Sequence, residues 1–279
     1  MDKLLIVDGH NLLFQMFYGM PHHFYGKNNQ PIWATFGFVG ALFKIIDIIK
    51  PSNVLVVFDG EHGNQRFDLL DEYKSNRFDF SNVKDDENPF IQLEYIYKCL
   101  DYLNLKYYET VNNEADDIIA GYVNKYSEKK IVIVSNDTDF CQLVSKNVNI
   151  LKYKGKNSKL LTEADVFVKF GVHPYQYASF KSLVGDSSDV IKGVKGVGIK
   201  TAAKLLLEYD NLFAIIDNIN EIKNDKIKNN ILEYKERLYL NYKLIHLNYC
   251  GDLPYVFEEL RYDLPCISTK ELLEKIDIM

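Results

Sequence analysis

Three short runs of apolar, mostly β-branched residues in this chain each lead to aspartate, the first two directly and the third through Ser135 and Asn136. They cover residues 4–7, 54–58 and 131–134, and the aspartates that follow them are Asp8, Asp59, Asp137 and Asp139. Continuous apolar runs of this length are typical of parallel strands that are buried on both faces. Since the carboxyl ends of parallel strands lie at one edge of an open α/β sheet, we expect these four carboxylates to lie close together. Carboxylates at such distances repel one another unless a cation lies among them, so the sequence predicts a metal site.

The segments between these runs favour helices. Apolar residues recur at helical spacing over residues 36–49, 89–103 and 115–126, and a weaker strand is predicted near residues 105–108. Strands that alternate with helices predict the α/β class, with a mostly parallel sheet flanked by helices. Short helical segments without a convincing strand follow over residues 163–236, which predicts an additional helical module.

Composition restricts the setting and the partners. The four cysteines are scattered, which indicates neither a zinc site nor a disulfide framework, and no signal peptide or membrane span is evident. We therefore expect a cytoplasmic protein without a membrane partner, and a monomer. The net charge of −6 argues mildly against a nucleic-acid partner. If nine of the 39 acidic residues bind metal ions, however, the 33 basic residues outnumber the acids that remain.

Two further acidic groups add to the aspartates at the strand ends. Residues 114–117 open a predicted helix, where acids are also favoured by the helix dipole, and Asp186 and Asp189 lie in a second short segment. Each group alone is more typical of a cap or a loop, but three carboxylates within four residues cannot all cap one helix. Purely carboxylate ligands favour Mg²⁺ or Mn²⁺ over zinc, and two such ions promote phosphodiester hydrolysis. The nine candidate metal ligands are Asp8, Asp59, Glu114, Asp116, Asp117, Asp137, Asp139, Asp186 and Asp189.

A glycine-rich segment over residues 193–202 predicts a phosphate contact. It is not a P-loop, because Ile199 separates Gly198 from Lys200. It is typical of a tight turn that leads into a helix, whose first backbone amides bind a phosphate without reading a base. A plain connection between helices is the alternative, which we rank lower because lysines coincide with the glycines.

Seven motifs, in this order along the chain, resemble those of the bacterial and phage 5′ nuclease family. This family includes the N-terminal domain of bacterial DNA polymerase I and the stand-alone flap endonucleases. The resemblance covers roughly residues 1 to 250 and rests on residues 7–9, 58–59, 72–77, 114–117, 137–139, 185–189 and 193–202.

The resemblance implies a PIN-like nuclease core, two divalent ions and a helix-three-turn-helix module that grips duplex DNA, with K⁺ held in some members by the hairpin carbonyls of that module. It assigns Asp8, Asp59, Glu114 and Asp116 to the first ion, and Asp137, Asp139, Asp186 and Asp189 to the second, with Asp117 at the boundary. Lys74 and Arg77 would contact the scissile phosphate at the foot of an arch. The remaining implied DNA contacts are Arg66, Tyr73, Lys192, Gly193, Lys195, Gly196, Gly198, Lys200 and Thr201.

The implied division is a nuclease core over residues 1–180 with the arch region at 60–90, a helix-three-turn-helix module over 181–255, and a segment 256–279 with no assigned role. The expected activity is 5′-3′ exonuclease and flap endonuclease cleavage of branched or 5′-ended DNA, with RNA primer–DNA hybrids as a further substrate, in replication or repair.

This sequence departs from the family pattern at several positions. Val190 and Lys192 stand where the family usually has Asn and Pro, and Asn136 replaces a common Gly. The arch region is also acidic, which argues against strong threading of a single strand through it. Two other functions stay open: a PIN-like ribonuclease that acts on single-stranded RNA, and a non-catalytic module that binds branched DNA.

Overall fold

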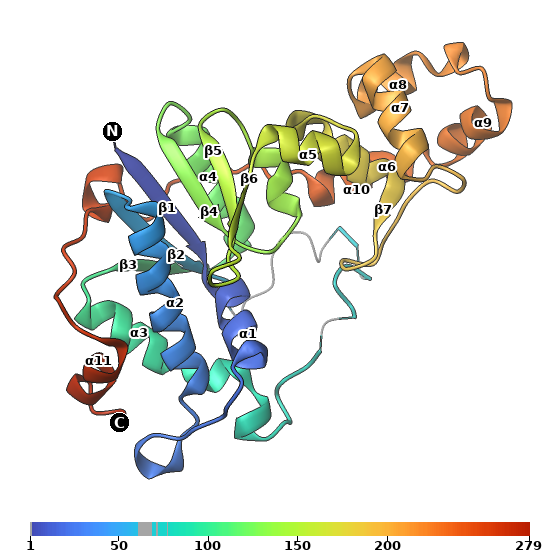
Figure 1. Cartoon of the computed structure of the whole chain (residues 1–279). Helices are drawn as coiled ribbons and strands as arrows, with labels where there is room; N and C mark the ends of the chain where they lie inside the picture. Colours follow the sequence, from blue (N-terminus) through green and yellow to red (C-terminus); the bar gives the residue numbers. More distant parts are fainter. Residues whose placement is uncertain (1, 61–68, 71, 77) are drawn as a thin grey trace.

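A six-stranded sheet forms the centre of the computed structural model, which describes residues 2–60, 69, 70, 72–76 and 78–279 (Figure 1). The strand order is β3-β2-β1-β4-β5-β6; the first five strands are parallel and β6 is antiparallel to β5. The strands are β1 Lys3–Asp8, β2 Asn53–Phe58, β3 Lys106–Glu109, β4 Lys130–Val134, β5 Val148–Lys152 and β6 Lys159–Leu161. The predicted class, a mostly parallel α/β sheet, is confirmed.

Helices cover both faces of this sheet, so alternate residues of each strand enter different cores. Leu5 and Val7 of β1 pack with α1, α2 and α3, whereas Leu4 and Ile6 pack with α4 and the helices that follow β6. Burial on both faces explains why the strands are continuous apolar runs. The helices before β6 are α1 Gly9–Gly19, α2 Trp33–Ile49, α3 Leu93–Tyr102 and α4 Ala115–Lys125.

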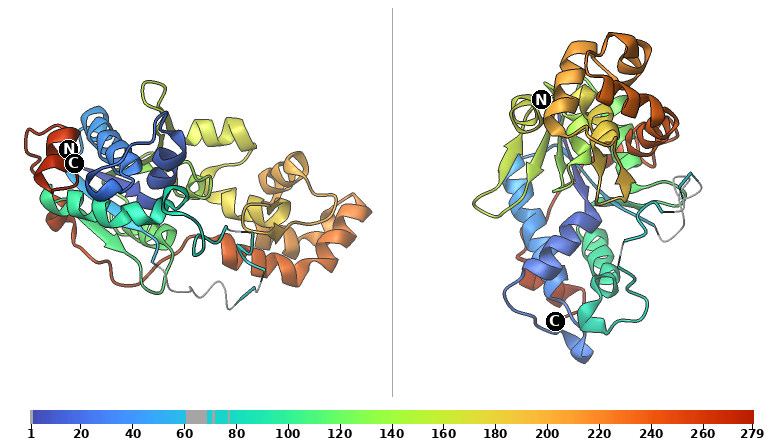
Figure 2. Two further views of the ribbon diagram at one scale, coloured as in Figure 1. Left: turned by 90° about the horizontal axis from the view of Figure 1, so that it is seen from below. Right: turned by 90° about the vertical axis from the view of Figure 1, so that its right-hand side faces the viewer.

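The later helices extend to one side of the sheet. Figure 2 shows α7, α8 and α9 at the far end of the molecule from β3. Their bounds are α5 Glu163–Phe170, α6 Tyr177–Val184, α7 Ile199–Tyr209, α8 Leu212–Asp217, α9 Asp225–Glu233 and α10 Lys235–Ile245. Leu205 and Leu212 belong to the same apolar cluster as Leu4 and Ile6, so the helical part shares a core with the sheet.

The elements that the sequence predicted agree with the structure except in detail, whereas α1, β5 and β6 were not predicted. The helix expected over 89–103 begins with a 3₁₀ turn, and the helical stretch 163–236 includes a two-stranded hairpin of β7 Gly185–Asp186 and β8 Ile191–Lys192. Strands of two residues are too short to leave a periodic signal in a sequence. The 3₁₀ turns η1 to η7 are Lys27–Asn29, Asp85–Glu87, Pro89–Gln92, Asp139–Leu143, Pro174–Gln176, Ile219–Glu221 and Phe257–Leu260.

The C-terminal segment returns to the sheet. The Asn53 side-chain amide donates to the Phe257 carbonyl over 2.6 Å, and α11 (Thr269–Lys275) packs against α2. Leu272 and Leu273 are fully buried in the core beneath α2. Among the described residues, no helix is long and apolar enough to cross a membrane.

Candidate active site

The three predicted strand ends lie side by side. β1 is paired with β2 on one side and with β4 on the other, and Asp8 is in register with Val57, two residues before Asp59. Asp137 follows β4 after two residues. The topology therefore brings the acids that terminate three apolar runs to one edge of the sheet, as the sequence predicted.

Asp8 connects helix α1 to the loop after β4 at this edge. One of its oxygens accepts from the Asn11 backbone N–H at 3.0 Å and caps α1, while the other accepts from the Ser135 hydroxyl at 2.8 Å. Burial raises the pKa of Asp8 to about 7, and the negative charges of Asp59 and Asp137 add to this effect. A carboxylate that is buried among other carboxylates is a suitable cation ligand.

The acids at the start of α4 do not act as ordinary caps. Glu114 occupies the N-cap position without a side-chain capping bond; instead its carboxylate contacts Lys74 Nζ and accepts from the Tyr73 hydroxyl at 3.3 Å. Asp59 Oδ1 accepts from the Ala115 N–H at 2.8 Å. Burial raises the pKa of Asp59, but hydrogen bonds with His10 and Ala115 outweigh this effect and bring it to about 2.

Asp116 lies close enough to these acids to be affected by their charges. Burial raises its pKa well above the usual range, and the charges of Asp137 and Asp8 raise it further. Asp117 is partly exposed one residue further along the first turn of α4. The structure thus places Asp8, Asp59, Asp116 and Asp137 close enough to perturb one another, and Glu114 beside them.

A second acidic cluster consists of Asp139, Asp186 and Asp189. One carboxylate oxygen from each lies within 4.8 Å of the other two. Asp139 opens the 3₁₀ turn after β4, and the other two residues lie in the β7–β8 hairpin. Burial raises the pKa of Asp139 to about 7; the pKa of Asp186 is lowered, since attraction to Lys181 outweighs the effect of burial. The Asp139 N–H donates to Asp137 Oδ1 at 2.8 Å, which joins this cluster to the first one.

Lys181 is a residue of the site that our sequence reasoning missed. Its ammonium group donates to Asp139 Oδ1 at 2.6 Å and contacts Asp186. Although burial alone would lower the pKa of Lys181, these two carboxylates raise it. A lysine among the apolar residues of a helix, five positions before a candidate ligand, was the available signal.

Lys74 touches both clusters. Its side chain is buried against Glu114, and its backbone N–H donates to the Asp189 carbonyl at 3.2 Å. Tyr73 packs with Ile191 and Ile245, so residues 72–76 are held against the β7–β8 hairpin and α10. The predicted contacts Arg66 and Arg77 lie outside the described residues.

The glycine-rich segment leads into α7 as expected. Gly198 is the N-cap of α7 and has open space around it, whereas Gly196 adopts a left-handed φ of 81°. Gly193 is enclosed, because a Cβ there would collide with the Val184 carbonyl. Lys195 and Lys200 are exposed near these glycines, and Lys192 forms an exposed ion pair with Glu72 at 3.8 Å. Thr201 lines a cleft of about 450 Å³ between α7 and α9 with Lys200 and Lys204.

Two family models match consecutive parts of the chain. The 5′-3′ exonuclease N-terminal resolvase-like domain matches residues 3–171, and the 5′-3′ exonuclease C-terminal SAM fold matches residues 172–266. Our boundary at residues 180 and 181 falls inside α6 and stays a prediction.

Curated relatives agree with these models. The chain is 33% identical to a 5′-3′ exonuclease of Mycoplasmopsis pulmonis over 99% of this chain and 90% of that protein. It is 30% identical to a 5′-3′ exonuclease of Buchnera aphidicola over 95% and 93% of the two proteins. A DNA polymerase I of Caldicellulosiruptor bescii is 36% identical over 96% of this chain, which spans only 31% of that protein.

Solved structures share the fold. The T5 D15 protein, co-crystallised with metal ions, matches with a TM-score of 0.73 at 24% identity over 88% of this chain and 89% of that chain. The catalytic core of Rad2 in complex with a DNA substrate matches with a TM-score of 0.61 at 16% identity over 98% and 86% of the two chains. With both halves of the chain matched by the family models and two relatives aligned over nine-tenths of their length, this chain belongs to the 5′-3′ exonuclease family.

Proposed function

We propose that this protein is a structure-specific 5′ nuclease that hydrolyses DNA phosphodiester bonds at 5′ flaps and 5′ ends by a two-metal-ion mechanism, in replication or repair. The observation that carries the proposal is the meeting of two carboxylate clusters at the edge of the sheet, which are joined by the bond from the Asp139 N–H to Asp137. Each cluster also holds a buried lysine, Lys74 on Glu114 in the first and Lys181 on Asp139 in the second. Complexes of the T5 flap endonuclease and of Rad2 with DNA support the choice of substrate.

The donor set fits two hard divalent ions, which we take to be Mg²⁺ or Mn²⁺. Every candidate ligand is a carboxylate, and buried acids whose pKa values are raised by burial and by one another gain most from a bound cation. Asp8, Asp59, Glu114 and Asp116 would hold the first ion; Asp137, Asp139, Asp186 and Asp189 would hold the second, with Asp117 beside them. Bound there, the ions would supply an activated water and neutralise charge on the leaving oxygen.

The protein's own groups would position the substrate. The Lys74 ammonium group contacts Glu114 in the first cluster, and the Lys74 backbone N–H donates to the Asp189 carbonyl beside the second. Lys74 would therefore contact a scissile phosphate, with Arg77 and Arg66 contributing from the arch at 60–90. The exposed glycine-rich turn before α7 would hold a duplex phosphate on its amides, and carbonyls of the same turn would bind K⁺. In this proposal residues 1–180 cleave, residues 181–255 grip DNA, and the protein acts as a cytoplasmic monomer on branched DNA and RNA primer–DNA hybrids.

The decisive experiment compares Asp139→Asn with Asp47→Asn on a labelled 5′ flap in Mg²⁺. Asp139 is buried in the second cluster, whereas Asp47 is exposed on α2. We expect the wild type and Asp47→Asn to cleave the flap, Asp139→Asn to lose at least about 100-fold in rate, and EDTA to abolish cleavage.

Failure of the wild type to cut the flap, or full activity of Asp139→Asn, would refute the proposal. Faster cleavage of plain single-stranded RNA would favour the ribonuclease alternative. Tight binding of intact flap DNA in Mg²⁺ would favour the non-catalytic one.

A further inference from the structure

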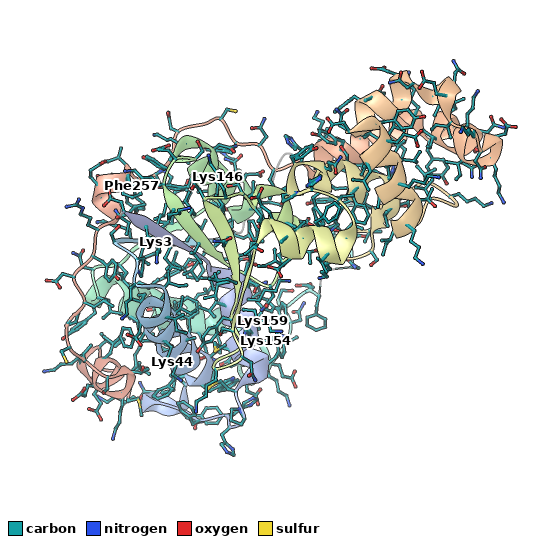
Figure 3. The ribbon with its side chains drawn as sticks, turned by 45° about the horizontal axis from the view of Figure 1, so that its top comes forward. Lys3, Lys44, Lys146, Lys154, Lys159 and Phe257 are labelled. Atoms are coloured by element: carbon teal, nitrogen blue, oxygen red, sulfur yellow. The ribbon has the colours of Figure 1, made fainter. Side chains whose placement is uncertain are left out.

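The hairpin between β5 and β6 carries a dense positive charge. Residues 152–159, which we call the lysine hairpin, contain four lysines and no acid in eight positions, although the whole chain has a net charge of −6. The lysines are Lys152, Lys154, Lys156 and Lys159. Lys154, Lys156 and Lys159 are exposed, and Figure 3 shows Lys154 and Lys159 together on this hairpin.

The backbone of the lysine hairpin is well defined. Gly155 supplies a left-handed φ of 56°, the Asn157 N–H donates to the Lys154 carbonyl at 3.0 Å, and the Ser158 hydroxyl accepts from the Lys154 N–H at 2.9 Å. Tyr153 is buried in the core of the sheet. The lysines are therefore presented from an ordered turn and not from a loose tail.

The positive charges on this hairpin repel one another. Lys152 lies directly opposite Lys159 in the antiparallel register, where like charges destabilise a strand pair. Burial lowers the pKa of Lys152, and repulsion from Lys169 and Lys154 lowers it further. Within the described part of the chain, none of the hairpin lysines forms an ion pair with a carboxylate within 4.0 Å. Weaker attraction acts between Lys152 and Asp137 and between Lys159 and the exposed Asp165. An anionic partner would relieve this repulsion.

The hairpin begins at the edge of the sheet that carries the metal site. β5 runs parallel to β4, so Lys152 lies at the same edge as the acids that follow β4. The Gln15 side chain connects the two: it donates to the Tyr153 carbonyl at 2.7 Å and accepts from the Asn136 side chain at 2.9 Å, one residue before Asp137. Both Figure 1 and Figure 2 place the hairpin beside α1 and well away from α7, α8 and α9.

We propose that the lysine hairpin is a second DNA-binding surface, which holds the phosphate backbone of the substrate on the side of the carboxylate clusters that is remote from α7–α9. The proposal rests on the proposed nuclease function. Because the one aromatic residue of the hairpin is buried and cannot stack on a base, the contact is made to phosphates and is independent of sequence. DNA held at both surfaces would pass over the carboxylates.

The test compares two triple variants of equal charge. One replaces Lys154, Lys156 and Lys159 by alanine, and the other replaces Lys44, Lys125 and Lys146 by alanine. The three control lysines are exposed and precede the amino ends of strands β2, β4 and β5, respectively. Binding of a labelled 5′-flap duplex is measured in Ca²⁺ over a range of salt concentrations. We expect the hairpin variant to lose on the order of 10-fold in affinity and its salt slope to fall by about 2 to 3, with the control unchanged. Replacement of the same three hairpin lysines by arginine should retain tight binding.

Shortening each arm of the duplex in turn locates the contact. Shortening the arm that contacts the lysine hairpin should lower the affinity of the wild type to that of the hairpin variant. The affinity of the hairpin variant should not change when the same arm is shortened. Equal affinity and salt slope for the wild type and the hairpin variant, or an equal loss in the control variant, would overturn the inference. If the wild type still cleaves the flap in that case, the proposed function stands and only this inference fails; loss of wild-type cleavage would count against the function itself.

Discussion

Two residues beside the carboxylates adopt the left-handed backbone conformation. Lys74 has a φ of 54° and Val190 a φ of 61°. This conformation is costly for a β-branched residue, whereas asparagine tolerates it. Val190 follows Asp189 in the β7–β8 hairpin, at a position where the related family usually has Asn. The structure gives that preference a physical reason.

Replacing Val190 by asparagine should therefore stabilise the protein. We expect Val190→Asn to raise the free energy of unfolding by about 1 kcal/mol, as measured by denaturant titration in EDTA. Val111→Asn is the control, since Val111 is exposed and has an ordinary negative φ. A stability gain that is no larger at position 190 than at position 111 would contradict this account of Val190.

At the scale of elements, strand ends and turns concentrate buried acids. Asp8 ends β1 and Asp139 opens the turn after β4, and burial raises the pKa of each to about 7. Burial also raises the pKa of Asp116, in the first turn of α4, well above its usual range. The fold thus places carboxyl groups that resist ionisation close together. The positive charge of Lys181 offsets only part of the resulting loss of stability.

This crowding predicts an unusual pH dependence of stability. A carboxyl group whose pKa is higher in the folded state holds its proton there at pH values where the unfolded chain has released it. In EDTA, the free energy of unfolding should therefore fall as the pH rises from about 4 to 7. Added Mg²⁺ should raise the melting temperature, and by more at pH 8 than at pH 5, because protons compete with the cation.

Thermal melts across this pH range, with and without Mg²⁺, provide the measurement. A metal-free protein that becomes more stable between pH 4 and 7 would show that these acids are not buried together. A shift with Mg²⁺ that is independent of pH would show that the ion binds elsewhere.

At the scale of the whole molecule, the C-terminal segment closes the fold. The sequence assigned no role to residues 256–279, yet η7 (Phe257–Leu260) packs beside β2 and α11 packs on α2. Leu272 and Leu273 belong to the same core as Leu5 and Val7 of β1. This segment therefore supports the strands that position Asp8 and Asp59.

Truncating a buried leucine of α11 should destabilise the entire sheet. We expect Leu272→Ala to lower the free energy of unfolding by about 2 to 5 kcal/mol, which is the usual cost of a cavity in a core. Leu207→Ala is the matched control, because Leu207 is 55% exposed. Equal losses from the two variants in denaturant titrations would mean that α11 is not part of the core.

The elements could be predicted from the sequence because strand and helix signals are local. Apolar runs and helical spacing located β1, β2, β4, α2 and α4 to within a few residues, and the rule for the carboxyl ends of parallel strands grouped Asp8, Asp59 and Asp137. The short β7–β8 hairpin was missed, since two-residue strands have no periodicity. The place of α11 in the core could not be predicted either, because that contact joins residues more than 200 positions apart.

The sequence by itself determined which acids of the first cluster meet, because each of them ends or follows a strand or opens a helix, and the patterns of those elements are local. Asp186 and Asp189 of the second cluster lie in the short β7–β8 hairpin, which has no such pattern. Only the tertiary structure decided how those acids are compensated: Lys181 between Asp139 and Asp186, and Lys74 on Glu114 with its backbone on Asp189. The reason is that burial and long-range pairing set the energy of a charge, and neither is contained in the residues next to it.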